Sequence, residues 1–130
     1  MGAFTLLALL LLAATANAGT VDGLLQQYRS EGAGELSANR GAALWRREVT
    51  PAQGSGPRQC GSCHGSNLRQ AGKHARTGKR IEPLAPSVNP ARLKDAQKIE
   101  KWFRRNCKWT WGRECTAQEK GDLVLFLSNQ

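Results

Sequence analysis

The residues best suited to chemistry lie at positions 60–64, which read Cys-Gly-Ser-Cys-His. Two cysteines with two residues between them place their thiols one turn apart, the spacing at which both add to the two vinyl groups of a haem. The histidine that follows is then positioned under the iron as its proximal ligand. We therefore predict one covalently bound haem c, attached through Cys60 and Cys63, with His64 on the iron.

The same five residues allow three other interpretations: a redox-active dithiol, half of a zinc site, or a disulfide beside an incidental histidine. A thioredoxin-like dithiol belongs at the start of a helix that follows a strand. A zinc site needs four nitrogen or sulfur ligands, and recruiting Cys107 or Cys115 would leave an odd thiol. Haem attachment instead leaves Cys107 and Cys115 as a disulfide pair, which suits an oxidising compartment.

The start of the chain indicates that compartment. Residues 3–14 are apolar apart from Thr5, and they lead to Ala16-Asn17-Ala18, a small-x-small pattern that a signal peptidase cuts. We predict a signal peptide over residues 1–18, cleaved after Ala18, and a mature periplasmic domain over residues 19–130. Because no Lys or Arg precedes the apolar run, an uncleaved anchor is the alternative.

The mature sequence carries helix signals and few strand signals, so we predict an all-α fold. Prolines and glycines predict loops over residues 49–59 and 81–90. Apolar residues at helical spacing predict helices over 20–31, over 37–47, from Asn89-Pro90 to about Arg105, and from Thr116 onward. Two helix starts have recognisable caps: Asn89 precedes a first-turn proline, and Thr116 with Glu119 forms a capping box.

Positive charge is concentrated in one part of the chain. The net charge is +9, and residues 69–108 contain twelve Lys or Arg against three acidic residues. A basic surface attracts acidic proteins, anionic membranes or nucleic acids, and export makes nucleic acid the least favoured of these. We predict an acidic protein partner and no nucleic acid. A solubilising face without a dedicated partner is the alternative.

The sixth iron position has few candidate ligands. The only methionine is Met1, which is lost with the signal peptide, so His/Met ligation is excluded. His74 is the only other histidine, and we favour a surface imidazole or a neighbour of a haem propionate there. Asn106, a water, or no ligand remain open from the residues alone. Lys79 and Arg80 are candidates for pairing with the propionates.

Several segments of the chain resemble the sphaeroides haem protein family of oxygen-binding cytochromes c, which carry a DUF1924-type domain. The matching segments span most of the mature domain: Cys60 to Gly65, Arg76 to Lys79, Ile81 to Ser87, Glu100 to Trp102, Arg105 to Cys107, Gly112 to Thr116, and Glu119 to Lys120. The resemblance implies a class I cytochrome c-like helical fold around one haem c. It also implies Asn106 as the ligand of the ferric iron, with the disulfide Cys107–Cys115 beside it.

The resemblance further implies what such a protein does. A neutral amide is a weak donor that reduction of the iron releases, so a ferrous haem would bind O2, NO or CO. Redox partners such as a dihaem cytochrome c or a membrane cytochrome b would dock on the basic face. We consider Trp102, Trp109 and Trp111 as pocket walls, with core packing as the alternative for each.

The alternative function is a haem enzyme that reduces O2 or a nitrogen oxide at the vacated iron position. Such an enzyme needs a proton donor near the iron. The acidic candidates within residues 81–115 are Glu82, Glu100 and Glu114, and none is flanked by a histidine. We therefore favour an electron-transfer and gas-binding protein, and we predict no catalytic residue.

Overall fold

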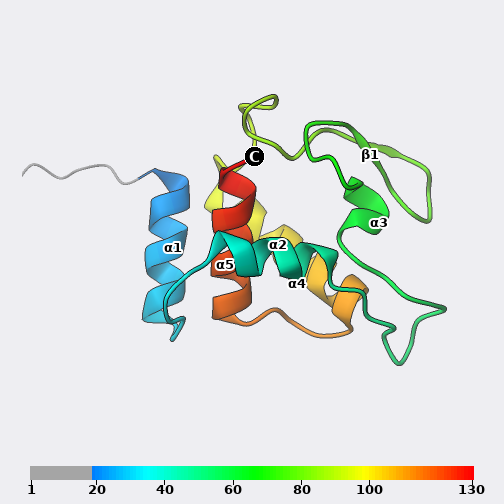
Figure 1. Cartoon of the computed structure of the whole chain (residues 1–130), viewed down its shortest axis with the longest axis horizontal. Coiled ribbons are helices and arrows are strands. Elements are labelled where there is room, and N and C mark those ends of the chain that lie inside the picture. The colour runs from blue at the N-terminus through cyan, green and yellow to red at the C-terminus, as the bar shows by residue number, and fades with distance from the viewer. Residues whose placement is uncertain (1–18) are drawn as a thin grey trace, which may run out of the picture.

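The computed structural model describes residues 19–130, and the predicted signal peptide, residues 1–18, lies outside the described residues. Helices dominate this part of the chain, and the only strands within it form one short antiparallel hairpin (Figure 1). The elements are α1 (Thr20–Ser30), α2 (Ala38–Arg46), α3 (Gly61–His64), β1 (Gly72–Lys73), β2 (Arg80–Ile81), α4 (Ala96–Trp111) and α5 (Ala117–Ser128). Within residues 19–130, none of the helices has the length and apolar character needed to cross a membrane.

Helices α2 and α5 cross near the centre of the molecule (Figure 1), and the space around Gly41 shows that they approach each other very closely. A Cβ added at Gly41 would lie 2.0 Å from the backbone oxygen of Asp122 and 2.6 Å from Cβ of Phe126. A Cβ added at Gly121 would lie 2.6 Å from Cδ2 of Leu36. Both distances to carbon are far shorter than an optimal carbon contact. The crossing therefore requires glycine at position 41, where backbone of α5 is in the way, whereas Gly121 faces the end of the Leu36 side chain before α2.

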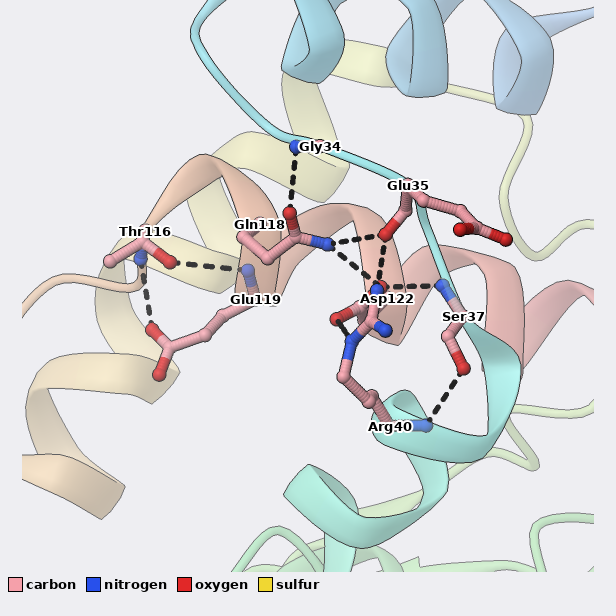
Figure 2. Close-up of polar contacts among 8 residues, drawn as sticks. All are labelled: Gly34, Glu35, Ser37, Arg40, Thr116, Gln118, Glu119 and Asp122. Atoms are coloured by element: carbon pink, nitrogen blue, oxygen red, sulfur yellow. Dashed lines mark hydrogen bonds and ion pairs between the residues drawn. The ribbon is translucent and has the colours of Figure 1, made fainter.

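A buried carboxylate fixes the same crossing (Figure 2). Asp122 is 1 % exposed, and it accepts hydrogen bonds from the backbone N–H of Ser37 at 2.6 Å and from Arg40 Nε at 2.9 Å. Gln118 Nε2 donates a further bond at 3.1 Å. Burial of a charge is costly unless the charge is paired and hydrogen-bonded, and here both conditions are met. The network holds the first turn of α2 on α5.

Helix α1 packs on α5, with Leu24 and Tyr28 against Val124. The Tyr28 hydroxyl donates a hydrogen bond to Glu100 on α4, and Lys120 Nζ on α5 donates another to Glu100 at 2.8 Å. Burial, together with the neighbouring Glu100 carboxylate, raises the pKa of Tyr28, so the phenol remains a proton donor. One polar bridge thus links three helices.

Helices α1, α2 and α5 confirm the predicted helices to within about two residues at their ends. Ser37 caps α2 by accepting from the backbone N–H of Arg40 at 3.3 Å, and the capping box of Thr116 and Glu119 is complete. The β1–β2 hairpin was not predicted. Its strands have two residues each, too few for an alternating pattern to be recognised.

Helix α4 corrects the prediction of a helix from Asn89-Pro90 to about Arg105. It begins at Ala96, where the Asp95 carboxylate accepts from the backbone N–H of Lys98 at 2.9 Å. It ends at Trp111 and is followed by the C-cap residue Gly112, whose φ of +74° suits a glycine. Asn106 therefore lies inside the helix and not at its end.

Residues 89–94 are not helical because their local bonds serve the preceding loop. The Asn89 side-chain amide does not cap a helix; it donates to the Pro83 carbonyl at 2.9 Å. Leu93 has a φ of +58°, a left-handed conformation that interrupts any right-handed helix. The proline at the expected first turn is thus part of a loop, as the prolines of residues 81–90 predict.

Candidate haem site

Residues 60–64 form one helical turn, α3 with Cys60 before it, that brings the two cysteines and His64 together. The backbone N–H of His64 donates to the Cys60 carbonyl at 3.2 Å, and Ser62 Oγ accepts from the N–H of Gln59 at 3.1 Å. Both thiols are free and half-buried. This turn presents two thiols and an imidazole in the arrangement that thioether attachment of a haem needs.

The β1–β2 hairpin packs directly on this turn. A Cβ added at Gly72 would lie 2.2 Å from the Cys63 carbonyl oxygen and 2.8 Å from Cα of His64, so only glycine permits the approach. The backbone N–H of Ala75 donates to Cys63 Sγ at 3.3 Å. The hairpin therefore orients the second thiol, a role that sequence reasoning missed.

The His64 ring is mostly enclosed by protein. Its centroid lies 5.5 Å from that of Trp45 on α2, and its Nδ1 is buried without a hydrogen-bond partner among residues 19–130. Burial lowers the pKa of His64 to about 4, with the positive charge of Arg92 as a further cause. The imidazole is therefore neutral at pH 7, which is the form that binds a metal ion.

The chemistry of these groups fits a haem c and argues against the other interpretations. Burial raises the pKa of the Cys60 thiol to about 11, so this sulfur is a protonated thiol and not a redox-active thiolate. Cys107 and Cys115 are bonded to each other, with Cα atoms 5.7 Å apart, and cannot complete a zinc site. The turn also follows a loop, unlike a thioredoxin-like dithiol, which follows a strand.

Asn106 is exposed on α4, immediately before the disulfide. Cys107 and Cys115 are 5 % and 9 % exposed, so the disulfide belongs to the core that also holds Trp111. This bond ties the last turns of α4 to the short loop that precedes α5. Among residues 19–130, the side-chain amide of Asn106 makes no hydrogen bond, and no described contact joins Asn106 to His64.

The three candidate pocket tryptophans differ in exposure. Trp111 is 6 % exposed and packs in the core, which supports the core-packing interpretation for this residue. Trp102 is 44 % exposed and lies one turn before Asn106 on α4. Trp109 is half-buried, with the Arg58 guanidinium 4.5 Å from its ring. Trp102 and Trp109 therefore both lie within one helical turn of Asn106 and stay candidates to line a site there.

His74 has the hydrogen bonds of a loop residue. Its Nδ1 accepts from the backbone N–H groups of Arg76 at 3.3 Å and Thr77 at 3.2 Å. A neutral imidazole whose Nδ1 accepts hydrogen bonds carries its proton on Nε2, so neither ring nitrogen has a lone pair free for iron. This bonding favours the surface interpretation of His74 over iron ligation.

Four cations line a hollow of about 650 Å³ between the 51–58 loop and the C-terminal part of α4: Arg58, Arg105, Lys108 and Arg113. Sequence reasoning selected Lys79 and Arg80 for the propionates instead, and Arg80 pairs with Glu82 at 2.8 Å. Arg58 is fixed by a 2.9 Å bond from Nη1 to the Trp109 carbonyl. The hollow is thus a second candidate location for anionic groups, and no sequence pattern identified it.

The chain matches a known family and characterised relatives. A family model described as a domain of unknown function, DUF1924, matches residues 31–127. The cytochrome c-type protein SHP of Cereibacter sphaeroides is 41% identical over 107 residues, which cover 82% of this chain and 81% of SHP. Cytochrome c'' of Methylophilus methylotrophus is 41% identical over 68 residues, which cover 52% of this chain and 47% of that protein.

Solved structures of the same relatives have the same fold. The structure of oxidised SHP, an oxygen-binding cytochrome c, matches with a TM-score of 0.77 and 37% identity, covering 86% of this chain and 98% of that one. The crystal structure of oxidised cytochrome c'' from Methylophilus methylotrophus matches with a TM-score of 0.72 and 30% identity, covering 85% and 94%. These matches confirm the predicted all-α, class I cytochrome c-like fold.

Proposed function

The chain belongs to the DUF1924 family and is a monohaem c-type cytochrome with covalently bound haem c, and on this premise we propose that it transfers electrons in the periplasm and binds a diatomic gas at its reduced iron. Haem, when bound, supplies a redox-active iron with an axial position for a small ligand. Cys60 and Cys63 hold the haem through thioethers, and His64 is the proximal ligand. The observation that supports this proposal most directly is the helical turn, which presents two free thiols and one buried, neutral imidazole.

Asn106 is the proposed sixth ligand of the ferric iron. Its amide is neutral and exposed, so it reaches a metal without breaking a hydrogen bond or burying a charge. The disulfide that begins at Cys107 limits the motion of the helix at this point. A weak amide donor leaves a ferrous iron readily, and ligand detachment is the subject of a solution structure of cytochrome c''. Release of Asn106 would open the iron to O2, NO or CO.

The redox partner is proposed to dock on the basic hairpin of Lys73, Arg76 and Lys79. These side chains are exposed, and none takes part in an ion pair of residues 19–130. The adjacent Ala75 N–H donates to Cys63 Sγ, so the hairpin lies beside a sulfur that would form one of the two thioethers. An acidic partner, such as a dihaem cytochrome c or a membrane cytochrome b, would bind there with a salt-dependent rate. The predicted signal peptide supports a periplasmic location.

Optical spectra of the ferric and dithionite-reduced protein, before and after CO, test this proposal. We expect a low-spin ferric form that becomes high-spin and CO-reactive on reduction. Asn106→Ala should lose the low-spin ferric character, whereas Asn39→Ala, which removes an exposed asparagine of α2, should not. A reduced protein that stays low-spin and does not bind CO would contradict gas binding and indicate a retained ligand such as His74.

The haem-enzyme alternative gains no support from the three candidate carboxylates. Each one contacts a cation: Glu82 pairs with Arg80, Glu114 lies 3.5 Å from Lys108, and Glu100 bonds to Lys120. The hydrogen bond from Arg80 and its charge lower the pKa of Glu82, so this carboxylate is a poor proton donor at neutral pH. We therefore retain electron transfer with gas binding as the single proposed function.

A further inference from the structure

The hollow between the 51–58 loop and the C-terminal part of α4 is strongly basic. Its volume is about 650 Å³, and no acidic residue of the described chain lines it, whereas four cationic residues do: Arg58, Arg105, Lys108 and Arg113. A cavity needs only about 10–15 Å³ to hold one water molecule, so the hollow has room for much more than a small ion. Pro51, Ala52 and Trp109 add apolar surface to its walls. The hollow therefore suits an extended occupant that carries negative charge.

The walls of the hollow are held in place by contacts within the protein. The loop is closed by two backbone hydrogen bonds between Val49 and Arg58, at 2.9 and 2.8 Å. Pro51 lies against the end of α4, where a Cβ added at Gly112 would lie 3.3 Å from Cβ of Pro51. The disulfide at Cys107 fixes this part of α4. A preformed site binds at a lower entropic cost than a site that becomes ordered on binding.

Arg58 is oriented by its contacts but is not neutralised by them. Its Nη1 donates to the Trp109 carbonyl at 2.9 Å, and its guanidinium carbon lies 4.5 Å from the centre of the Trp109 ring. Arg58 takes part in none of the ion pairs of residues 19–130. Because both contacts are neutral, the guanidinium keeps its charge, and its remaining N–H groups can donate to a carboxylate.

The other three cations differ in how far their charge is compensated. Arg113 donates two bonds of 2.8 Å to one carboxylate of α5, which leaves little of its charge for a ligand. Lys108 lies 3.5 Å from Glu114, and both side chains are well exposed, so this ion pair is weak. Arg105 is exposed and takes part in none of the ion pairs of the described chain. Arg58 and Arg105 therefore supply the uncompensated charge of the hollow.

We propose that the hollow binds an acidic polypeptide segment of a redox partner, whose carboxylates pair with Arg58 and Arg105. The inference rests on the proposed electron-transfer function. Guanidinium groups bind carboxylates through paired N–H donors, and arginine is enriched in protein interfaces. Arg58 precedes Cys60 by two residues, so the bound segment would lie next to the haem-attachment turn.

The basic hairpin is a separate surface, which lies beside Cys63. It differs from the hollow in shape, because no cavity lined by the hairpin accompanies its charges among those described for residues 19–130. An electron carrier exchanges electrons with a donor and an acceptor, so two docking surfaces are compatible with one function. The hollow is the surface with fixed walls and an oriented guanidinium, and we expect it to bind an acidic segment more tightly.

Calorimetric titration of the holoprotein with an acetylated, amidated peptide of six aspartates tests the proposal. We expect binding that weakens as salt is added, and no measurable binding of a matched peptide of six asparagines. Arg58→Gln and Arg105→Gln should each weaken binding of the aspartate peptide roughly 10-fold, because a charge-assisted hydrogen bond is lost. Arg29→Gln, which removes an exposed arginine of α1 that makes no ion pair among residues 19–130, should change the affinity by less than about 2-fold.

Two comparisons locate the bound peptide and define its chemistry. Arg76→Gln removes an exposed arginine of the basic hairpin and should weaken binding less than Arg58→Gln does. An equal or larger effect of Arg76→Gln would overturn the proposal, because the peptide would then bind basic surface in general. Citrate should bind more weakly than the aspartate peptide, and an equal affinity would overturn the proposal by indicating a site for small polyanions.

Arg105→Gln keeps the test valid if Arg58→Gln does not fold, since the Arg105 side chain donates no hydrogen bond among residues 19–130. Circular dichroism checks the folding of each variant. If neither variant weakens binding more than Arg29→Gln does, the proposal is wrong. Pyridine haemochrome and CO-difference spectra report haem attachment and gas binding separately, so a failure of the proposed function is distinguishable from a failure of peptide binding.

Discussion

The two ends of helix α2 differ in how well their polar groups are satisfied. At the first turn, Ser37 and Arg40 bond to the buried Asp122 carboxylate, and Gly41 packs on the α5 backbone. At the other end, the buried nitrogens Trp45 Nε1 and Arg47 Nε have no hydrogen-bond partner among residues 19–130.

Unpartnered buried nitrogens also occur in the elements that surround the second end of α2. The other two unpartnered buried nitrogens of the described chain are His64 Nδ1 and Trp111 Nε1, and the Trp45 ring lies 5.5 Å from that of His64. Buried polar groups in folded proteins are nearly always paired, so a cluster of exceptions marks a functional site. At the α2–α5 crossing the buried carboxylate has its hydrogen-bond partners within the protein. Near α3, the unpartnered buried nitrogens indicate a site for a bound cofactor.

The test with the largest expected effect removes both thiols that are proposed to attach the haem. In Cys60→Ala with Cys63→Ala we expect no covalent haem, because no other free cysteine exists among residues 19–130. Acid–acetone extraction should then release all haem from the protein. The matched control replaces Cys107 and Cys115 by serine and should retain covalent haem. Haem that stays with the Cys60→Ala, Cys63→Ala protein would contradict the proposed attachment.

The next test disrupts the α2–α5 crossing. Gly41→Ala places a methyl group 2.0 Å from a backbone oxygen, so the helices must separate, and we expect a loss of about 3 kcal/mol in the free energy of unfolding. Gly23→Ala is the control, because an added Cβ there meets nothing within 4 Å, and it should stabilise α1 by about 0.5–1 kcal/mol. Denaturant unfolding measures both, and equal effects would contradict the close crossing.

The smallest expected effect concerns Glu119, which connects the two regions. Arg113 donates two bonds of 2.8 Å to this carboxylate, and Arg47 Nη2 donates one of 3.1 Å. These bonds lower its pKa from 4.5 to about 2. Because the folded pKa is lower than the unfolded one, the stabilisation is present above about pH 4.5 and is lost as pH falls towards 2.

We expect Glu119→Gln to lose about 1 kcal/mol of stability at pH 7, since the Arg113 partner is well exposed. The difference from wild type should shrink as pH falls from 4.5 to 2. Unfolding measured across this pH range checks the effect. Glu48→Gln, an exposed carboxylate in no ion pair of residues 19–130, is the control. A difference that is constant with pH would contradict the assigned pKa.

Local signals in the sequence predicted elements whose determinants lie within a few residues of one another. The capping box of Thr116 and Glu119 joins residues three apart, and the start of α5 follows it. The Asn89-Pro90 signal failed because the Asn89 side chain bonds backwards to Pro83 and Leu93 adopts a left-handed conformation. A cap pattern predicts a helix only when the residues after it are free to continue one.

The sequence by itself determined the haem-attachment turn, because the spacing of Cys60, Cys63 and His64 is a property of one helical turn. It also determined the all-α fold, through apolar residues at helical spacing. Only the tertiary structure decided which groups surround that turn: Trp45 lies nineteen residues before His64 and Arg92 lies twenty-eight after it. Contacts at such separations depend on how loops and helices pack, and no local spacing encodes them.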